Sequence, residues 1–288
     1  MHPCSIFSAN TQYPISLVTN QPKRTNKQAI FWGAIIGIGV FLLILLVGFG
    51  VTSWQQNRES GELQVSDNQK TLILEAAAKD QIDLGNYESA ISILSEVLDQ
   101  TDERSEPYYY RAVSRSALGQ YEQALIDFDA SIAINPHWSL PLAGRGSANV
   151  ALGDLDAAVY DFSKAINLEP DQAILYSNRG QAYHQQSRLT KARDDYNQAL
   201  DLNPSMVAAR FNRGVLLYAM GKTDLAIKDF SRAITSDPSH APPYFNRGMI
   251  YAEQGEIEDA RADLERFIAL TDDAGWKALA LEALSDLE

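Results

Sequence analysis

The sequence predicts an all-α protein: an α-solenoid of about six helix-turn-helix repeats with a C-terminal capping helix, behind one N-terminal transmembrane helix. Two observations lead to this fold class. From residue 71 onward, similar residues return every 34 positions, and a repeat of that length builds a stacked array rather than one compact domain. Before the array, residues 30–51 form an uninterrupted run without a charged side chain.

Residues 1–29 precede the apolar run and contain no acidic residue. They hold the basic cluster "PKRTNK" and several Pro, Asn, Ser and Thr residues without apolar periodicity, so we expect a flexible tail. The single cysteine of the chain, Cys4, lies in this tail. One cysteine provides neither a disulfide framework nor a thiolate metal site.

The run at 30–51 reads "IFWGAIIGIGVFLLILLVGFGV". A helix of this length covers roughly 33 Å, enough for a hydrocarbon core of about 30 Å. A cleaved signal peptide and a buried soluble helix are the alternatives. The run exceeds the roughly 7–15 apolar residues of a signal peptide and no small-x-small cleavage site follows, so we predict a retained single-pass anchor. Gly33 and Gly37 form a small-xxx-small pair that permits weak self-association.

The basic residues around this run predict its orientation. Lys23, Arg24 and Lys27 precede it, whereas only Arg58 and Lys70 follow it closely. Cytoplasmic flanks carry the excess of Lys and Arg, so the N-terminus is predicted in the cytoplasm and the array in the periplasm, a lumen or the exterior. Residues 52–70 are polar and lack a core face, which predicts a linker.

The array is strongly acidic. Of the 24 basic and 37 acidic residues in the chain, five and three lie in residues 1–70, which leaves 19 and 34 for residues 71–288. Such a surface repels phosphate backbones, so nucleic-acid binding is excluded. Two interpretations stay open: a basic or neutral partner, or an acidic helical surface that is only solvated.

One unit, residues 173–206, shows the physical pattern of every repeat. Tyr176, Gly180 and Tyr183 lie at helical spacing in a first helix, and Ala192 and Tyr196 lie on one stripe of a second helix. The small residues let the two helices approach closely. A proline ends this unit and its equivalents, since it cannot continue a helix. These prolines are Pro136, Pro170, Pro204 and Pro238.

In the unit at 173 these residues read Y-x₂-R-G-x₂-Y, then A-x₃-Y and Pro204, which resembles the tetratricopeptide repeat (TPR) family. The resemblance covers residues 71–274 as six units, which begin at 71, 105, 139, 173, 207 and 241. The first unit departs most, because Ala77 and Ala78 replace the Arg-Gly pair. Residues 275–288 are predicted as the capping helix that a terminal repeat requires.

Arginine stands at one position of five units, and an aspartate follows it sixteen residues later each time. The pairs are Arg111 with Asp127, Arg145 with Asp161, Arg179 with Asp195, Arg213 with Asp229, and Arg247 with Asp263. The first unit lacks both charges, since Ala77 and Ile93 stand there. Because the charges are present or absent together within a unit, we predict intra-unit ion pairs that join the two helices. A ladder of ligand-binding arginines is the alternative.

The resemblance implies that partners bind in a concave groove lined by the first helices. Asn178, Asn212 and Asn246 precede the arginines in three units, and an amide can bind a peptide backbone through both donor and acceptor groups. A local bond within each helix is the alternative. Five further residues are expected beside this row, as apolar or aromatic anchors or as packing between units: Tyr109, Phe211, Phe245, Tyr218 and His184.

No catalytic, cofactor or metal site is predicted. The four histidines lack metal-ligand spacing, and no phosphate loop or nucleophile motif occurs. His137 and His240 follow unit-ending prolines and are expected to face solvent.

The chain is thus predicted to be a membrane-anchored interaction scaffold or assembly factor that binds other proteins or peptides. Its order of parts is similar to membrane-anchored TPR proteins of cyanobacterial thylakoids, which bind protochlorophyllide reductase or assist photosystem assembly, and this resemblance leaves open a cytoplasmic or stromal array. An accessory subunit of a membrane-associated enzyme complex, for pigment synthesis or envelope biogenesis, is one alternative. A self-assembling scaffold is another.

Overall fold

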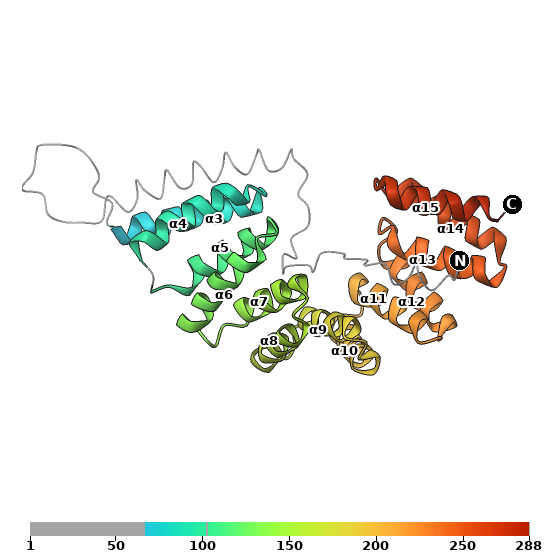
Figure 1. Cartoon of the computed structure of the whole chain (residues 1–288), viewed down its shortest axis with the longest axis horizontal. Helices are drawn as coiled ribbons and strands as arrows, with labels where there is room; N and C mark the ends of the chain where they lie inside the picture. The colour runs from blue at the N-terminus through green and yellow to red at the C-terminus, as the bar shows by residue number, and fades with distance from the viewer. Residues whose placement is uncertain (1–66, 102, 288) are drawn as a thin grey trace, which may run out of the picture. The chain divides into compact units, whose positions relative to one another are not determined.

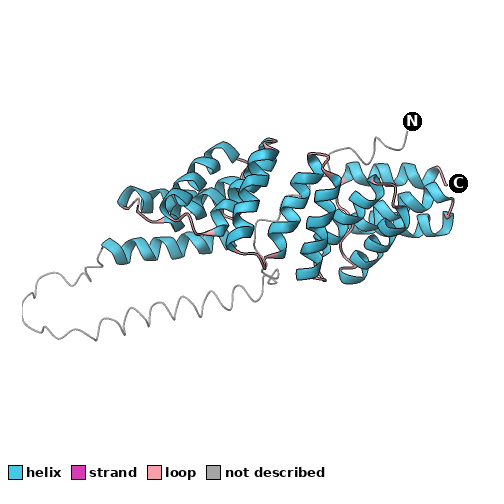
Figure 2. Cartoon of the chain, turned by 90° about the horizontal axis from the view of Figure 1, so that it is seen from below, coloured by secondary structure: helices cyan, strands magenta, loops and turns pink. Residues whose placement is uncertain are grey.

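The computed structural model describes residues 67–101 and 103–287, and in them it contains thirteen α-helices and no strand (Figures 1 and 2). Twelve of these helices form six sequential pairs with the predicted 34-residue period. The pairs are α3 (Asp67–Asp83) with α4 (Tyr87–Gln100), α5 (Ser105–Ala117) with α6 (Tyr121–Ile134), α7 (Ser139–Leu152) with α8 (Leu155–Leu168), α9 (Ala173–Gln185) with α10 (Leu189–Leu202), α11 (Val207–Ala219) with α12 (Thr223–Ser236), and α13 (Pro242–Gln254) with α14 (Ile257–Leu270).

Two predicted boundaries change. Helix α3 begins at Asp67, inside the predicted linker 52–70. The sequence did not indicate this start, because the first turn of the helix is polar and shows no apolar periodicity. The capping helix α15 covers Ala274–Ser285 rather than 275–288. It begins there because the Asp273 side chain accepts a hydrogen bond from the backbone N–H of Trp276 and so caps the helix.

The predicted tail (1–29), transmembrane run (30–51) and most of the linker lie outside the described residues. Within residues 67–101 and 103–287, none of the helices combines the length and the apolar character that crossing a membrane requires.

A residue with positive φ ends the first helix of each pair and reverses the chain. Glycine stands there in five units, at positions 85, 119, 153, 221 and 255, with φ between 71° and 84°. The fourth unit has Ser187 instead, with φ of 59°. Glycine adopts this left-handed conformation without the steric penalty that a Cβ atom causes.

The core of each pair is built from a small residue and a large one. The alanines at the repeated position of the second helix are wholly buried: Ala90, Ala124, Ala158, Ala192, Ala226 and Ala260. Four residues later the rings of Phe128, Phe162, Tyr196 and Phe230 are also wholly buried. Each of three of these rings lies against a glycine of the first helix. A Cβ added at Gly214 would lie 2.7 Å from Cε1 of Phe230, so the close approach requires glycine.

The pairs stack in chain order. From α4 onward each helix contacts the next, and the first helices of neighbouring pairs also contact one another: α5 with α7, α7 with α9, α9 with α11, and α11 with α13. In Figure 1, α7, α9 and α11 accordingly lie on the inner side of the row, and α8, α10 and α12 lie on its outer side. We call the surface of the first helices the inner face and that of the second helices the outer face.

Candidate functional site

Each of the five repeated arginines lies against the aspartate of its own unit. In the fourth unit, Nε of Arg179 donates to Oδ2 of Asp195 at 2.8 Å, and Nη2 donates to Oδ1 at 2.8 Å. These hydrogen bonds to Asp195 raise the pKa of Arg179. The same two-bond arrangement joins Arg111 to Asp127, Arg145 to Asp161, Arg213 to Asp229, and Arg247 to Asp263.

The remaining terminal nitrogen of each arginine reaches the preceding unit. Nη1 of Arg179 donates to the Ser163 hydroxyl on α8 at 3.1 Å. The equivalent bonds join Arg111 to Ser95, Arg145 to Asp129, Arg213 to Asn197, and Arg247 to Ser231. Each guanidinium therefore links three helices and is used within the fold, which leaves no ladder of free charges for a ligand.

The predicted ion pairs lie within a unit, and this third contact with the preceding unit was not predicted. The signal was present in the sequence. A polar residue occupies positions 95, 129, 163, 197 and 231, sixteen residues before each arginine. A planar guanidinium has donors on three nitrogens, so it can serve both neighbours at once.

The three asparagines of the predicted row do not have equivalent surroundings. Asn246 donates its side-chain N–H to the carbonyl of Pro242 at 2.9 Å, which is the local bond within one helix. Within the described part of the chain, the amides of Asn178 on α9 and Asn212 on α11 have no hydrogen-bond partner. Asn212 is half-buried, whereas Asn178 is only 7% exposed. Two amides on neighbouring first helices are thus not used by hydrogen bonds within the described residues.

Three of the five residues expected beside the asparagine row follow the packing alternative, because their rings lie against other rings of the array. Phe211 and Phe245 are 4% and 5% exposed, and Tyr109 is half-buried. Burial raises the pKa of Tyr109 to about 12.

An aromatic ring that follows the second helix of the unit lies against each of these three side chains. Trp138 lies 4.7 Å from the Tyr109 ring, His240 lies 5.8 Å from that of Phe211, and Trp276 lies 5.2 Å from that of Phe245. His240, which was expected to face solvent, is half-buried instead. Its half-buried ring meets Phe211 edge-on, and burial lowers its pKa. His137 is exposed, as expected.

Tyr218 and His184 occupy equivalent positions near the C-terminal ends of α11 and α9. The Tyr218 hydroxyl donates to Oε2 of Glu253 on α13 at 2.6 Å, so it links two first helices. His184 is half-buried, and burial lowers its pKa, which keeps the ring neutral at pH 7. Both are partly accessible, unlike Phe211 and Phe245.

Comparison with protein families identifies the repeat. A family model described as "TPR repeat" matches residues 146–187 and 180–221. A second model, described as "Tetratricopeptide repeat", matches residues 75–137 and 211–275. No curated protein sequence matches the chain.

Several solved structures share the fold. YrrB, described as a TPR protein with an unusual peptide-binding site, is 24% identical, with a TM-score of 0.51 over 67% of this chain and 97% of that one. A thermophilic TPR protein from Thermus thermophilus is 22% identical, with a TM-score of 0.54 over 62% and 98%. One from Parabacteroides merdae is 20% identical, with a TM-score of 0.63 over 75% and 86%. The repeat pattern, the stacked helix pairs and these matches agree: the chain belongs to the tetratricopeptide repeat family.

Proposed function

We propose that this protein is a scaffold that binds an extended segment of a partner protein on its inner face, at the fourth and fifth units. The observation that carries the proposal is the pair of side-chain amides of Asn178 and Asn212, which have no partner among the described residues. An amide side chain offers both a donor and an acceptor, the two groups that a peptide bond displays. A row of amides therefore binds a backbone without reading its sequence.

Tyr218 and His184 lie on the same first helices as the amides and supply partly exposed rings. Rings of this kind contribute contact area at a low cost in side-chain entropy. Peptide binding is also stated for YrrB, a protein of the same fold. Partner binding without catalysis is the behaviour typical of TPR arrays, and it is the function we assign here.

Selection of peptides on the full-length chain tests this site. Peptides are selected from a random displayed library on the wild-type protein, and their affinities are measured by fluorescence anisotropy. Replacement of both Asn178 and Asn212 by alanine is expected to weaken binding at least tenfold, because both backbone contacts are lost. Asn246→Ala is the matched control, since that amide already bonds to Pro242, and it is expected to change affinity by less than twofold. Equal affinities for the double variant and the wild type would rule out the amide pair.

We further propose that residues 30–51 anchor the array to a membrane, with the N-terminus in the cytoplasm. The uncharged length of this run and the basic residues before it support the proposal. Anchoring restricts the array to the membrane surface and raises the local concentration of a membrane-associated partner. Protease added to sealed inside-out vesicles is expected to leave residues 71–288 intact and to remove a tag fused before residue 1. Digestion of the array in these vesicles would show the opposite orientation. Loss of the protein from carbonate-washed membranes would contradict the proposed membrane anchor.

A further inference from the structure

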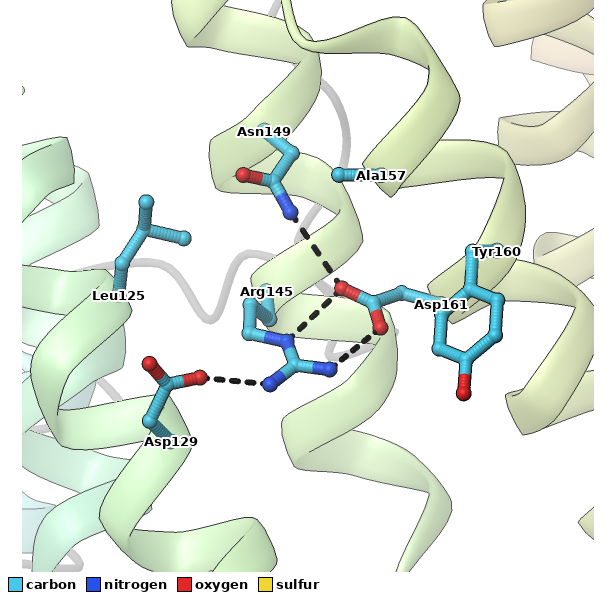
Figure 3. A pocket seen from close by; sticks show the side chains of 7 residues that line it. All are labelled: Leu125, Asp129, Arg145, Asn149, Ala157, Tyr160 and Asp161. Atoms are coloured by element: carbon cyan, nitrogen blue, oxygen red, sulfur yellow. Dashed lines mark hydrogen bonds and ion pairs between the residues drawn. The ribbon is translucent and has the colours of Figure 1, made fainter.

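A pocket of about 290 Å³ is lined mainly by residues of second helices, and neither Asn178 nor Asn212 lines it. Figure 3 shows its walls: Leu125 and Asp129 come from α6, Arg145 and Asn149 from α7, and Tyr160 and Asp161 from α8. Small-molecule pockets usually measure about 300–1,000 Å³. This one therefore has room for a single long side chain.

The pocket exists because one residue is small. Position 149 is asparagine, whereas the equivalent positions of the neighbouring units carry larger side chains: Arg115, Tyr183, Leu217 and Tyr251. Asn149 is 7% exposed, and its amide nitrogen donates to Oδ2 of Asp161 over a long 3.4 Å. Its oxygen points away from Asp161, toward the side of the pocket where Leu125 and Asp129 lie (Figure 3). That oxygen is an acceptor that faces the cavity.

The pocket also carries one unbalanced negative charge. Arg145 bonds to two carboxylates, Asp161 at 2.6 Å and Asp129 at 2.6 Å. In the other four units the third partner of the arginine is a neutral serine or asparagine. Asp161 is 2% exposed and holds three donors, whereas Asp129 is 61% exposed and uses one oxygen. The second oxygen of Asp129 is thus available to a cation.

Apolar groups border these acceptors. Leu125 lies on one wall and the Tyr160 ring on the other, on α6 and α8 respectively (Figure 3). Ile126 and Tyr160, one repeat apart on these helices, are 68% and 58% exposed. The ring attracts an ammonium group already, because Nζ of Lys164 lies 5.5 Å from its centroid.

We propose that this pocket binds the lysine side chain of a partner polypeptide. The methylene stem lies between Leu125 and Tyr160, and the ammonium donates to the free oxygen of Asp129 and to the amide oxygen of Asn149. Lysine fits better than arginine because one Asp129 oxygen is taken by Arg145, which prevents a second two-bond guanidinium pair. The excess of acidic residues in the array draws a basic segment toward this site. This site does not depend on the function proposed for the inner face.

Peptide binding to the full-length protein tests the pocket. The probe is an acetylated, amidated pentapeptide with a central lysine between two isoleucines, and the control peptide has norleucine in place of lysine. The lysine peptide is expected to bind at least tenfold more tightly by isothermal titration, because only its ammonium reaches the two oxygens. Equal affinities of the two peptides, or the absence of measurable binding by the lysine peptide, would overturn the proposal. Tighter binding of an arginine peptide overturns the choice of lysine.

Two variants copy residues that the array already uses at the same position of other units. Asp129→Ser keeps a hydrogen-bond acceptor for Arg145, as Ser95, Ser163 and Ser231 do, and removes the charge. Asn149→Tyr fills the pocket as Tyr183 and Tyr251 do. Each variant is expected to weaken binding of the lysine peptide at least tenfold, while the helical circular dichroism spectrum and the melting transition of the protein stay unchanged. Unchanged affinity in both variants contradicts the pocket.

The double variant Asn178→Ala with Asn212→Ala separates this site from the inner face. It is expected to bind the lysine peptide with wild-type affinity, since neither residue lines the pocket. If this variant also binds the lysine peptide at least tenfold more weakly, the peptide binds on the inner face and the proposed pocket is rejected.

Discussion

At the scale of single residues, Tyr196 is the exception among the buried rings of the array. Phenylalanine occupies the equivalent places at Phe128, Phe162 and Phe230, all wholly buried. Tyr196 is equally buried, and its hydroxyl has no partner within residues 67–101 and 103–287. Burial also raises the pKa of Tyr196, so its hydroxyl stays protonated. An unpaired buried hydroxyl costs free energy that a phenyl ring avoids.

Tyr196→Phe is expected to raise the free energy of unfolding by about 1–3 kcal/mol, the cost of leaving a buried polar group unsatisfied. Urea denaturation followed by circular dichroism measures the change. Phe162→Tyr is the matched control and is expected to lower stability, because it buries a hydroxyl at the equivalent place. A lower urea midpoint for Tyr196→Phe would mean that the hydroxyl has a partner such as a bound water.

At the scale of helices and turns, five glycines and one serine reverse the chain within the pairs. Ser187 is the one non-glycine residue with positive φ in the described part of the chain. A Cβ atom in this left-handed conformation costs roughly 1–2 kcal/mol. Glycine avoids this cost, but it loses more conformational entropy on folding, which offsets part of the gain. The turn after α9 is therefore less favourable than the equivalent turn after α11, which has Gly221.

Ser187→Gly is expected to stabilise the protein by about 1 kcal/mol, since it removes the left-handed strain and no Cβ contact is needed at the equivalent glycines. Differential scanning calorimetry measures the rise in melting temperature. Gly221→Ser, the reverse change one unit later, is expected to lower the melting temperature by a similar amount. If both variants melt at the wild-type temperature, backbone strain at this turn is negligible.

The arginine contacts also belong to the scale of helices, because each guanidinium joins three of them. Arg179→Ala removes hydrogen bonds to Asp195 and Ser163 and leaves a carboxylate that is 10% exposed without its partner. Loss of one partner of such a pair costs about 3–5 kcal/mol. We expect a large drop in the urea midpoint. Arg188→Ala at an exposed turn is expected to change stability by at most about 0.5 kcal/mol.

The double variant Arg179→Ala with Asp195→Ile copies the first unit, which has Ala77 and Ile93 at these places. It is expected to be more stable than Arg179→Ala alone, because no unpaired carboxylate is left in the interior. The double-mutant cycle therefore yields a coupling energy of opposite sign to the single losses. A double variant whose losses simply add would show that the two side chains act independently.

At the scale of the whole array, each unit is stabilised by its neighbours, as in other stacked repeats. The last unit depends on α15, whose Trp276 covers Phe245 and whose Ala280 is wholly buried. The stability of an end is therefore separable from that of the middle.

Removal of residues 274–288 is expected to expose Phe245 and Phe267 and to speed amide hydrogen exchange in α13 and α14. Exchange in α7 to α10, which do not contact α15, is expected to stay near the wild-type rate. Hydrogen exchange read by mass spectrometry measures both regions. Uniform loss of protection along the array would show that it unfolds as one cooperative unit.

The repeat period and the contacts within a unit are legible in the amino-acid sequence. The six units follow from the 34-residue period. Within a unit, the buried alanine and ring positions and the arginine–aspartate pairs involve residues at most sixteen positions apart, on one helix or on two helices joined by a short turn. The shared absence of both charges in the first unit, at Ala77 and Ile93, even indicated which arginine meets which aspartate.

Contacts between units were decided only by the tertiary structure. The third hydrogen bond of each arginine, the burial of Phe245 under α15, and the pocket beside Asn149 all depend on how neighbouring pairs pack. A periodic sequence repeats the same residue types but does not state the angle and depth at which one pair rests on the next. Those are set by the volumes of side chains from three helices at once, and so a residue that looks like a groove anchor in the sequence can lie in the core.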